Sequence, residues 1–196
     1  MGQIGSPDEG EQVLSPLVDR AQQGDEDAFV ALTQAVGDRC MAIAYRILRD
    51  AALAEDAVQT ALTTAWRELP TLRDHDRFEP WLHRTLVNLC YAEAKRRRRA
   101  SAQVLAMVPD ALQTPDATLT VHDRDQLERG FRRLPPEQRA VLVFHHYLGY
   151  TVAEVSDHLG IPLGTAKSRL RYATAALRGA LEADARLPAN SEERPA

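Results

Sequence analysis

Long uncharged hydrophobic runs are missing from this 196-residue sequence, and cysteine and aromatic residues are few. No stretch reaches the roughly 18 uncharged apolar residues needed to cross a bilayer, and the N-terminus lacks a basic-then-apolar signal pattern. We therefore expect a cytoplasmic protein with no membrane insertion. The two cysteines, Cys40 and Cys90, each lie inside an apolar helical pattern, which favours buried thiols over a disulfide.

Signatures of catalysis and of metal binding are also missing. His145 and His146 are adjacent, so they diverge on a helix and lack the spacing of metal ligands. The sequence has no CxxC pair and no local Ser/His/Asp signature, and the glycines at 160–164 lack the Lys-Ser/Thr pair of a phosphate-binding loop. We expect a protein that is not an enzyme and that has no cofactor and no metal site.

The net charge of −4 conceals an uneven distribution of charge. Residues 82–100 carry six basic residues against one acid, and residues 158–181 carry four basic residues and no acid. Acids gather in residues 1–26, where six oppose one base. Two basic segments on an acidic chain indicate local contact with phosphates, rather than general attraction to polyanions.

Apolar residues recur at spacings of three or four along most of the chain, which predicts an all-α protein. Residues 100–122 contain no Lys or Arg, two prolines and only weak periodicity, so they predict a flexible linker between two helical domains. We place the domains at 14–99 and 123–185, with a disordered N-terminus at 1–13 and a frayed tail at 186–196.

In the first domain, the apolar stripes predict a bundle of three or four helices. The expected core includes both tryptophans, and residues 70–77 form a polar loop too charged to be buried. The principal positions of the predicted stripes are Phe29, Leu32, Val36, Cys40, Ile43, Ile47, Val58, Ala61, Leu62, Ala65, Trp66, Leu69, Phe78, Trp81, Leu82, Thr85, Leu86 and Leu89.

The second domain contains a helix-turn-helix pattern at about residues 151–177. Thr151 followed by Glu154 predicts a capping box, the glycines at 160 and 164 predict a turn, and Thr165 is expected to cap the second helix. At about 100° per residue, apolar residues of this second helix share one side and the basic and polar residues face away. The first turns of such a helix meet base edges in DNA. The candidates for DNA contact are Thr165, Lys167, Ser168, Arg169, Arg171 and Tyr172.

Several segments together resemble a known family, the extracytoplasmic-function (ECF) sigma factors, over about residues 16–181. The combination of these segments in this order is specific, whereas any one of them alone is not. The segments are AEDAVQTALTTAW (54–66), FEPWLHRTLVN (78–88), RRR (96–98) and LPPEQRAVLVFHHYLGYTVAEVSDHLGIPLGTAKSRL (134–170).

The resemblance implies a factor that binds RNA polymerase core, through its beta-prime and beta subunits, and directs promoter recognition, promoter melting and transcription initiation. Residues 14–99 would be sigma region 2 and residues 123–185 sigma region 4. Helix 165–177 would read the minus-thirty-five element as duplex DNA, and the linker would run towards the polymerase active centre and RNA exit path. The resemblance also implies an anti-sigma factor as partner and a monomer when the chain is free of partners.

The resemblance also assigns residues in the first domain. Glu55, Asp56 and Gln59 share one side of their helix, clear of its apolar stripe, and would dock on the coiled coil of beta-prime. The loop 70–77 and the face around Asn88 would melt the minus-ten element and hold a flipped base. The candidates for minus-ten contact are Arg73, His75, Arg84, Asn88, Tyr91, Lys95 and Arg96, those in the loop being weaker.

Two positions depart from the family pattern. Ala92 stands where relatives often carry an acidic or amide residue, and Tyr172 where they often carry arginine. The promoter preference therefore does not transfer from relatives.

Two other functions remain open at this point. A conventional helix-turn-helix regulator would bind a symmetric operator as a dimer, without polymerase. A helical adaptor would use the same helices to bind a protein, its basic residues being incidental.

Overall fold

The computed structural model describes residues 7–107 and 122–185 of the chain, and the side chains within 14–100 and 128–182. These residues form helices and short turns, with no strand among them, in agreement with the predicted all-α class. No helix of this described part is long and apolar enough to cross a membrane. The elements are α1 (Pro7–Gln22), α2 (Glu26–Leu48), α3 (Ala51–Glu68), the 3-10 turns η1 (Leu69–Thr71) and η2 (His75–Arg77), α4 (Phe78–Met107), α5 (His122–Arg133), α6 (Pro136–Leu142), the π-helical turn η3 (Val143–Tyr147), α7 (Val152–Leu159) and α8 (Leu163–Ala185).

Local sequence signals set where α2 and α3 begin. Asp25 accepts a hydrogen bond from the Ala28 amide at 3.0 Å, and Asp50 accepts one from the Leu53 amide at 3.2 Å. Both aspartates are N-caps, which satisfy amides that have no partner inside the helix. Arg49 between these helices has a left-handed backbone with φ of 60°, which turns the chain sharply from α2 into α3.

The N-terminal core lies between α2, α3 and α4. The periodic positions of α2 from Leu32 to Ile47 are buried as predicted, whereas Trp66 is 39 % exposed and lies against Phe29, with ring centroids 4.7 Å apart. Alanines rather than large residues form the buried stripe of α3, so this helix approaches its neighbours closely. The buried residues of that stripe are Ala54, Ala57, Ala61 and Ala65.

Two predicted boundaries are wrong. Helix α1 begins at Pro7, within the segment 1–13 predicted to be disordered, and α4 continues to Met107, eight residues into the predicted linker. Residues 100–107 contain no proline or glycine, so nothing local ends the helix before Pro109. Residues 108–121 and the predicted tail lie outside the described residues.

The C-terminal helices α5 to α8 follow the predicted signals closely. Pro136 occupies the first position of α6, where its missing N–H costs nothing, and Gly149 after η3 has a φ of +80°. The Val141, Phe144 and Leu148 side chains are buried.

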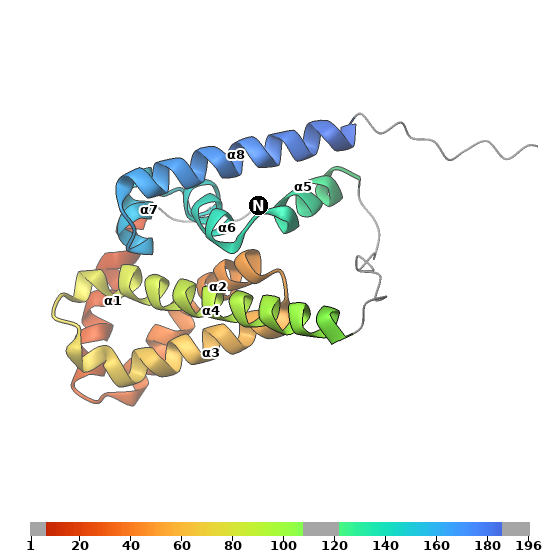
Figure 1. Ribbon diagram of the computed structural model, residues 1–196. Coiled ribbons are helices and arrows are strands. Elements are labelled where there is room, and N and C mark those ends of the chain that lie inside the picture. The colour runs from red at the N-terminus through yellow and green to blue at the C-terminus, as the bar shows by residue number, and fades with distance from the viewer. Residues whose placement is uncertain (1–6, 108–121, 186–196) are drawn as a thin grey trace, which may run out of the picture.

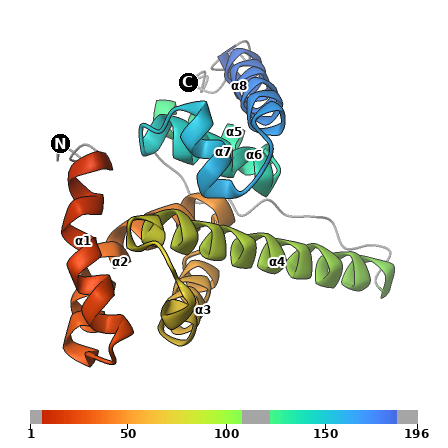
Figure 2. The same cartoon turned by 90° about the vertical axis from the view of Figure 1, so that its left-hand side faces the viewer.

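The N-terminal helices α1–α4 and the C-terminal helices α5–α8 form the two halves of the chain. These halves pack against each other (Figures 1 and 2). Helices α6 and α7 lie over α4, and α6 with η3 also contacts α2. As a result, α4 is buried on two sides, and its second buried side includes His83, Val87 and Cys90. Both cysteines are buried and unpaired, as predicted, and burial raises the pKa of each thiol to about 12.

Replacing Thr151 with alanine is expected to destabilise the C-terminal helices by about 1 kcal/mol. Its hydroxyl accepts a hydrogen bond from the Glu154 amide at 3.3 Å, and the Glu154 carboxylate accepts one from the Thr151 amide at 2.6 Å, which is the predicted capping box. Urea unfolding of the two proteins measures the difference. Thr63→Ala is a suitable control, because its hydroxyl bonds only to a carbonyl within its own helix, and a similar loss in this control would contradict a specific capping effect.

Candidate nucleic-acid interface

The pair α7 and α8 forms the predicted helix-turn-helix. Gly160 ends α7 in a left-handed conformation, with φ of 61°, and the Ser156 hydroxyl donates to the Ile161 carbonyl at 2.6 Å to hold the turn. Helix α8 begins earlier than predicted, because the Pro162 carbonyl accepts the amides of both Thr165 and Ala166, at 2.8 and 3.0 Å. Thr165 therefore lies inside the first turn of α8 and does not cap it.

The exposed surface of α8 carries Lys167, Arg171 and Tyr172, as predicted. The guanidinium of Arg171 donates to the Tyr172 hydroxyl at 3.1 Å and lies 4.9 Å from the centre of its ring. This contact couples the two side chains and holds the arginine close to the helix. Thr165 and Ser168 are half-buried, and the Ser168 hydroxyl donates to the Thr165 carbonyl at 3.0 Å.

The Arg169 side chain differs from the other α8 candidates because it is directed towards α4. One nitrogen of its guanidinium is buried without a hydrogen-bond partner, and its charge acts on Tyr91 of α4. Burial raises the pKa of the Tyr91 phenol, and the phenolic oxygen is also buried without a partner. Arg169 and Tyr91, predicted on separate DNA-contacting faces, therefore meet at the junction of the two halves.

The other predicted residues of α4 divide into two groups. Asn88 and Lys95 are exposed, and Arg96 is exposed but paired with Glu93 at 2.9 Å. Arg84 lies against the turn of the helix-turn-helix, so that a Cβ atom on Gly160 would be only 2.5 Å from its Nε atom. Arg84 thus contacts the turn that leads into α8.

The loop between α3 and α4 contains the two remaining minus-ten candidates. Arg73 is exposed, whereas the Nε2 atom of His75 lies 2.8 Å from the side-chain oxygen of Gln22 in α1. The amide nitrogen of Gln22 also donates to the carbonyls of Leu69 and Leu72, at 2.9 and 2.6 Å. Gln22 was not singled out in the sequence analysis, and it fixes both this loop and His75 to α1.

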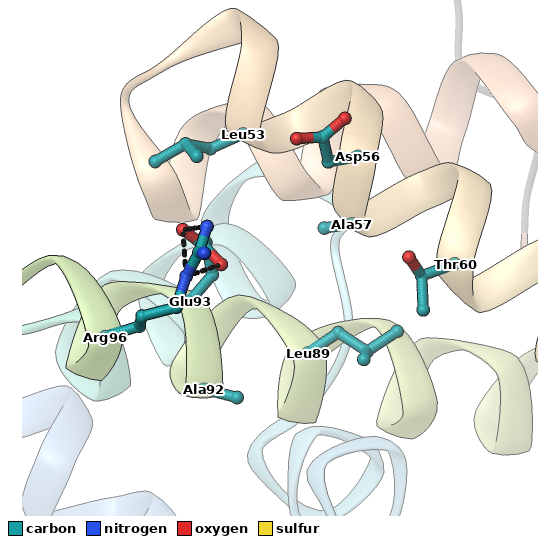
Figure 3. Close-up of a pocket in the computed structure, with 8 residues that line it drawn as sticks. All are labelled: Leu53, Asp56, Ala57, Thr60, Leu89, Ala92, Glu93 and Arg96. Carbon is teal, nitrogen blue, oxygen red and sulfur yellow. Dashed lines mark hydrogen bonds and ion pairs between the residues drawn. The ribbon is translucent and has the colours of Figure 1, made fainter.

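The predicted polymerase-contacting residues Glu55, Asp56 and Gln59 are all exposed on α3. Asp56 also borders a hollow of about 190 Å³ between α3 and α4, shown in Figure 3 with the Glu93–Arg96 ion pair at one end. The hollow brings the predicted polymerase-binding and minus-ten residues within one surface. It is lined by Leu53, Asp56, Ala57, Thr60, Leu89, Ala92, Glu93 and Arg96.

Sequence reasoning missed a pair of histidines at the centre of the junction. His83 of α4 and His158 of α7 are 1 % and 4 % exposed, and their Nδ1 atoms lie 3.2 Å apart. Burial lowers the pKa of His83 to about 3 and that of His158 to about 4. The one local signal was that each histidine falls on a side of its helix next to buried aliphatic residues.

Family comparisons match both halves of the chain. The model described as Sigma-70 region 2 matches residues 32–100, and that described as Sigma-70, region 4 matches residues 124–177. The first match runs from α2 into α4, and the second runs from α5 into α8.

Curated relatives cover most of the chain. The chain is 35 % identical over 154 residues to the ECF RNA polymerase sigma factor SigM of Mycobacterium tuberculosis, covering 79 % of this chain and 77 % of that protein. It is 34 % identical over 167 residues to SigL of the same species, an ECF RNA polymerase sigma factor, covering 81 % and 94 %. SigW of Bacillus subtilis, with the same description, is 25 % identical over 180 residues.

Two solved structures have a similar fold, each with a TM-score of 0.62. One is CnrH in complex with the cytosolic domain of CnrY, which is 26 % identical and covers 87 % of this chain and 97 % of that one. The other is the sigma factor RpoE in complex with the anti-sigma factor NepR from Bartonella quintana, at 22 % identity, covering 80 % and 98 %. The second similarity concerns the fold alone.

Proposed function

Since this chain belongs to the ECF group of the sigma-70 family, we propose that it binds RNA polymerase core and directs transcription initiation at promoters, with each half contributing a defined contact. It is a transcription-initiation factor and not an enzyme. The observation that supports this most directly is that both sigma regions match this one chain, in order. The chain also covers 77 % of a curated ECF sigma factor. The cytoplasm, where polymerase acts on DNA, is the proposed location.

In this proposal, α8 reads the minus-thirty-five element through Lys167, Arg171 and Tyr172. Arginine can pair with guanine in the major groove, whereas lysine contacts phosphates. Thr165 and Ser168 add contacts from the first turns of the helix, and Arg169 can join them only after leaving its place beside Tyr91.

The minus-ten surface consists of Asn88, Tyr91, Lys95 and Arg96 on α4, together with Arg84 and the loop that carries Arg73 and His75. Asn88 and Lys95 are accessible as the protein stands, and Tyr91 and Arg84 lie at the junction with the C-terminal half. Aromatic and cationic side chains of this kind hold unstacked bases and the strand that carries them.

An anti-sigma factor is a further proposed partner. CnrH and RpoE, which resemble this chain in fold, were each solved with a partner protein, and the partner of RpoE is described as an anti-sigma factor. Co-purification from the native cell tests this partner directly.

The decisive experiment is binding to polymerase core followed by run-off transcription. A sigma factor initiates from a defined promoter only with core, whereas a helix-turn-helix regulator would bind a symmetric operator as a dimer without polymerase. An adaptor would do neither. Operator binding without core, in the absence of promoter-dependent initiation, would overturn the proposal.

Asp56→Ala is expected to weaken association with polymerase core about three- to tenfold, because an exposed carboxylate at an interface contributes mainly to association rate and register. Within the described residues Asp56 forms no ion pair or hydrogen bond, so the fold should be unchanged. Asp38→Ala on α2 is a matched control, since Asp38 is equally exposed and lies outside the proposed surface. Fluorescence titration with core measures both, and equal affinity of Asp56→Ala and the unmodified chain would remove this assignment.

A further inference from the structure

The contact between the two halves involves part of the surface proposed to bind promoter DNA. Arg84, although exposed, lies against the Gly160 turn, and Tyr91 is half-buried near Arg169 of α8. A residue from each proposed DNA surface is therefore occupied by the other half of the same chain. While this packing persists, Tyr91 and Arg169 are partly covered, whereas Arg84 is exposed but lies in contact with the Gly160 turn.

The centre of this contact is an aromatic cluster that includes the histidine pair. The ring of His158 lies 4.1 Å from that of Tyr150 and 5.7 Å from that of Phe144, between centroids, and His83 meets Phe144 edge-on at 5.4 Å. With Nδ1 atoms 3.2 Å apart, one imidazole donates and the other accepts, so at least the accepting ring is neutral in this arrangement. Two protonated rings would place two donors and two positive charges against each other.

Charged groups around the histidine pair do not remove the cost of protonating it. Arg39 of α2 acts on both histidines and is itself paired with Glu79 of α4 at 2.9 Å, and Arg77 of η2 acts on His158. Glu154 and Asp157 of α7 favour the charged form of His158, yet burial outweighs them. The remaining Nε2 atom of His83 is buried without a partner, so nothing stabilises a proton there.

Contacts that do not titrate near neutrality complete the junction. The guanidinium of Arg46 lies 3.6 Å from the centre of the Tyr147 ring, and Arg49 is paired with Glu128 of α5. Arg139 of α6 is 8 % exposed and has no partner for its Nε atom, and burial together with the charges of Arg49 and Arg98 lowers its pKa to about 10. The junction thus holds a second buried positive charge besides the histidine pair, at Arg139.

We propose that His83 and His158 form a proton-sensitive latch that holds the C-terminal helices against α4, and that release of this latch frees Tyr91 and Arg169 for contact with DNA. The consequence for promoter binding rests on the proposed function, whereas the latch itself does not. In the free chain at neutral pH the latch is closed.

The direction of the pH dependence follows from proton linkage. In the closed form the histidine pKa values lie below the ordinary value of about 6.5, so the open form binds more protons as the pH falls below that value. The closed form is therefore fully favoured above pH 6.5 and loses this advantage at lower pH. If both histidines become exposed on opening, the ratio of closed to open forms falls up to about 100-fold between pH 7.5 and 5.5.

The test is small-angle X-ray scattering of the full chain at pH 7.5 and 5.5, with far-UV circular dichroism to confirm that the helices remain. Carboxylates stay ionised across this range, so the histidines are the groups that titrate. The unmodified chain and the control variant His146→Gln, whose histidine lies outside the cluster, should both expand at pH 5.5. The double variant His83→Phe/His158→Phe keeps ring packing without a titratable group and should stay compact. Expansion of this double variant equal to that of the unmodified chain, or no expansion of the latter, would overturn the latch.

A second variant keeps the proposal testable if the double variant does not fold. Tyr147→Ala removes the contact with Arg46 without touching the histidines, and it should expand the chain already at pH 7.5 and raise its affinity for a fluorescent single-stranded minus-ten oligonucleotide. Because the histidines are unchanged, no expansion of Tyr147→Ala even at pH 5.5 contradicts the latch. Expansion without a gain in binding leaves the latch standing and contradicts the assignment of the α4 face to DNA.

Discussion

Phe144→Ala is expected to destabilise the C-terminal half of the chain by about 3–5 kcal/mol, the range for removing a fully buried aromatic ring. Phe144 is 0 % exposed and its ring lies within 6.0 Å of the ring centres of His83, Tyr150 and His158. The alanine therefore leaves a cavity where α4, α7 and η3 meet. Because whole domains are stable by only about 5–15 kcal/mol, this loss is large.

Urea unfolding followed by circular dichroism measures this change. Val30→Ala is the control, because Val30 is 51 % exposed and its truncation should alter the unfolding free energy by less than about 0.5 kcal/mol. A loss below about 1 kcal/mol for Phe144→Ala would contradict the tight packing between the two halves. The same variant should also open the junction, so its scattering profile at pH 7.5 should resemble that of Tyr147→Ala.

Arg171→Ala is expected to weaken use of promoters by about 1–3 kcal/mol, which corresponds to roughly 5- to 150-fold, and to do so selectively. Arg171 is exposed on α8 and is held by the hydroxyl of Tyr172 at 3.1 Å. A guanidinium with a restricted position can pair with one base, so its removal should relax the preference at one position of the minus-thirty-five element.

Run-off transcription with core, on promoters that differ singly in the minus-thirty-five element, measures this selectivity. Arg178→Ala is a matched control, because Arg178 is exposed on the same helix and lies beyond the turns that meet bases. The control should reduce all promoters about equally or not at all. An equal loss on every promoter for Arg171→Ala would assign this residue to phosphate contact instead of base reading.

Much of the candidate site follows from local sequence. The capping box at Thr151 and the turn at Gly160 predict where α7 begins and ends, and helical periodicity predicts that Lys167, Arg171 and Tyr172 face outward. The exposure of Glu55, Asp56 and Gln59 follows from the same periodicity in α3. These features depend on residues within a few positions of each other, so no knowledge of the fold is required.

Other predictions fail because a competing partner or neighbour, near or far in the sequence, was not considered. The Pro162 carbonyl displaces Thr165 from the cap, and Trp66 is 39 % exposed while the buried positions of α3 are alanines. A distant partner also positions His75, because the side-chain oxygen of Gln22, 53 residues earlier, accepts a hydrogen bond from its Nε2 atom. In each case a competing partner, distant or unnoticed, determines where the side chain lies.

The sequence by itself determined the helices, their main caps, the family and the outward face of α8, because propensity, capping and amphipathic spacing act over a few residues. Tertiary structure alone decided that α4 is covered on a second side, that Arg84 contacts the Gly160 turn, and that His83 meets His158 from 75 positions away. An apolar stripe specifies that a face is to be covered. Which distant element covers it depends on the complementarity of two surfaces, and that exists only once both are folded.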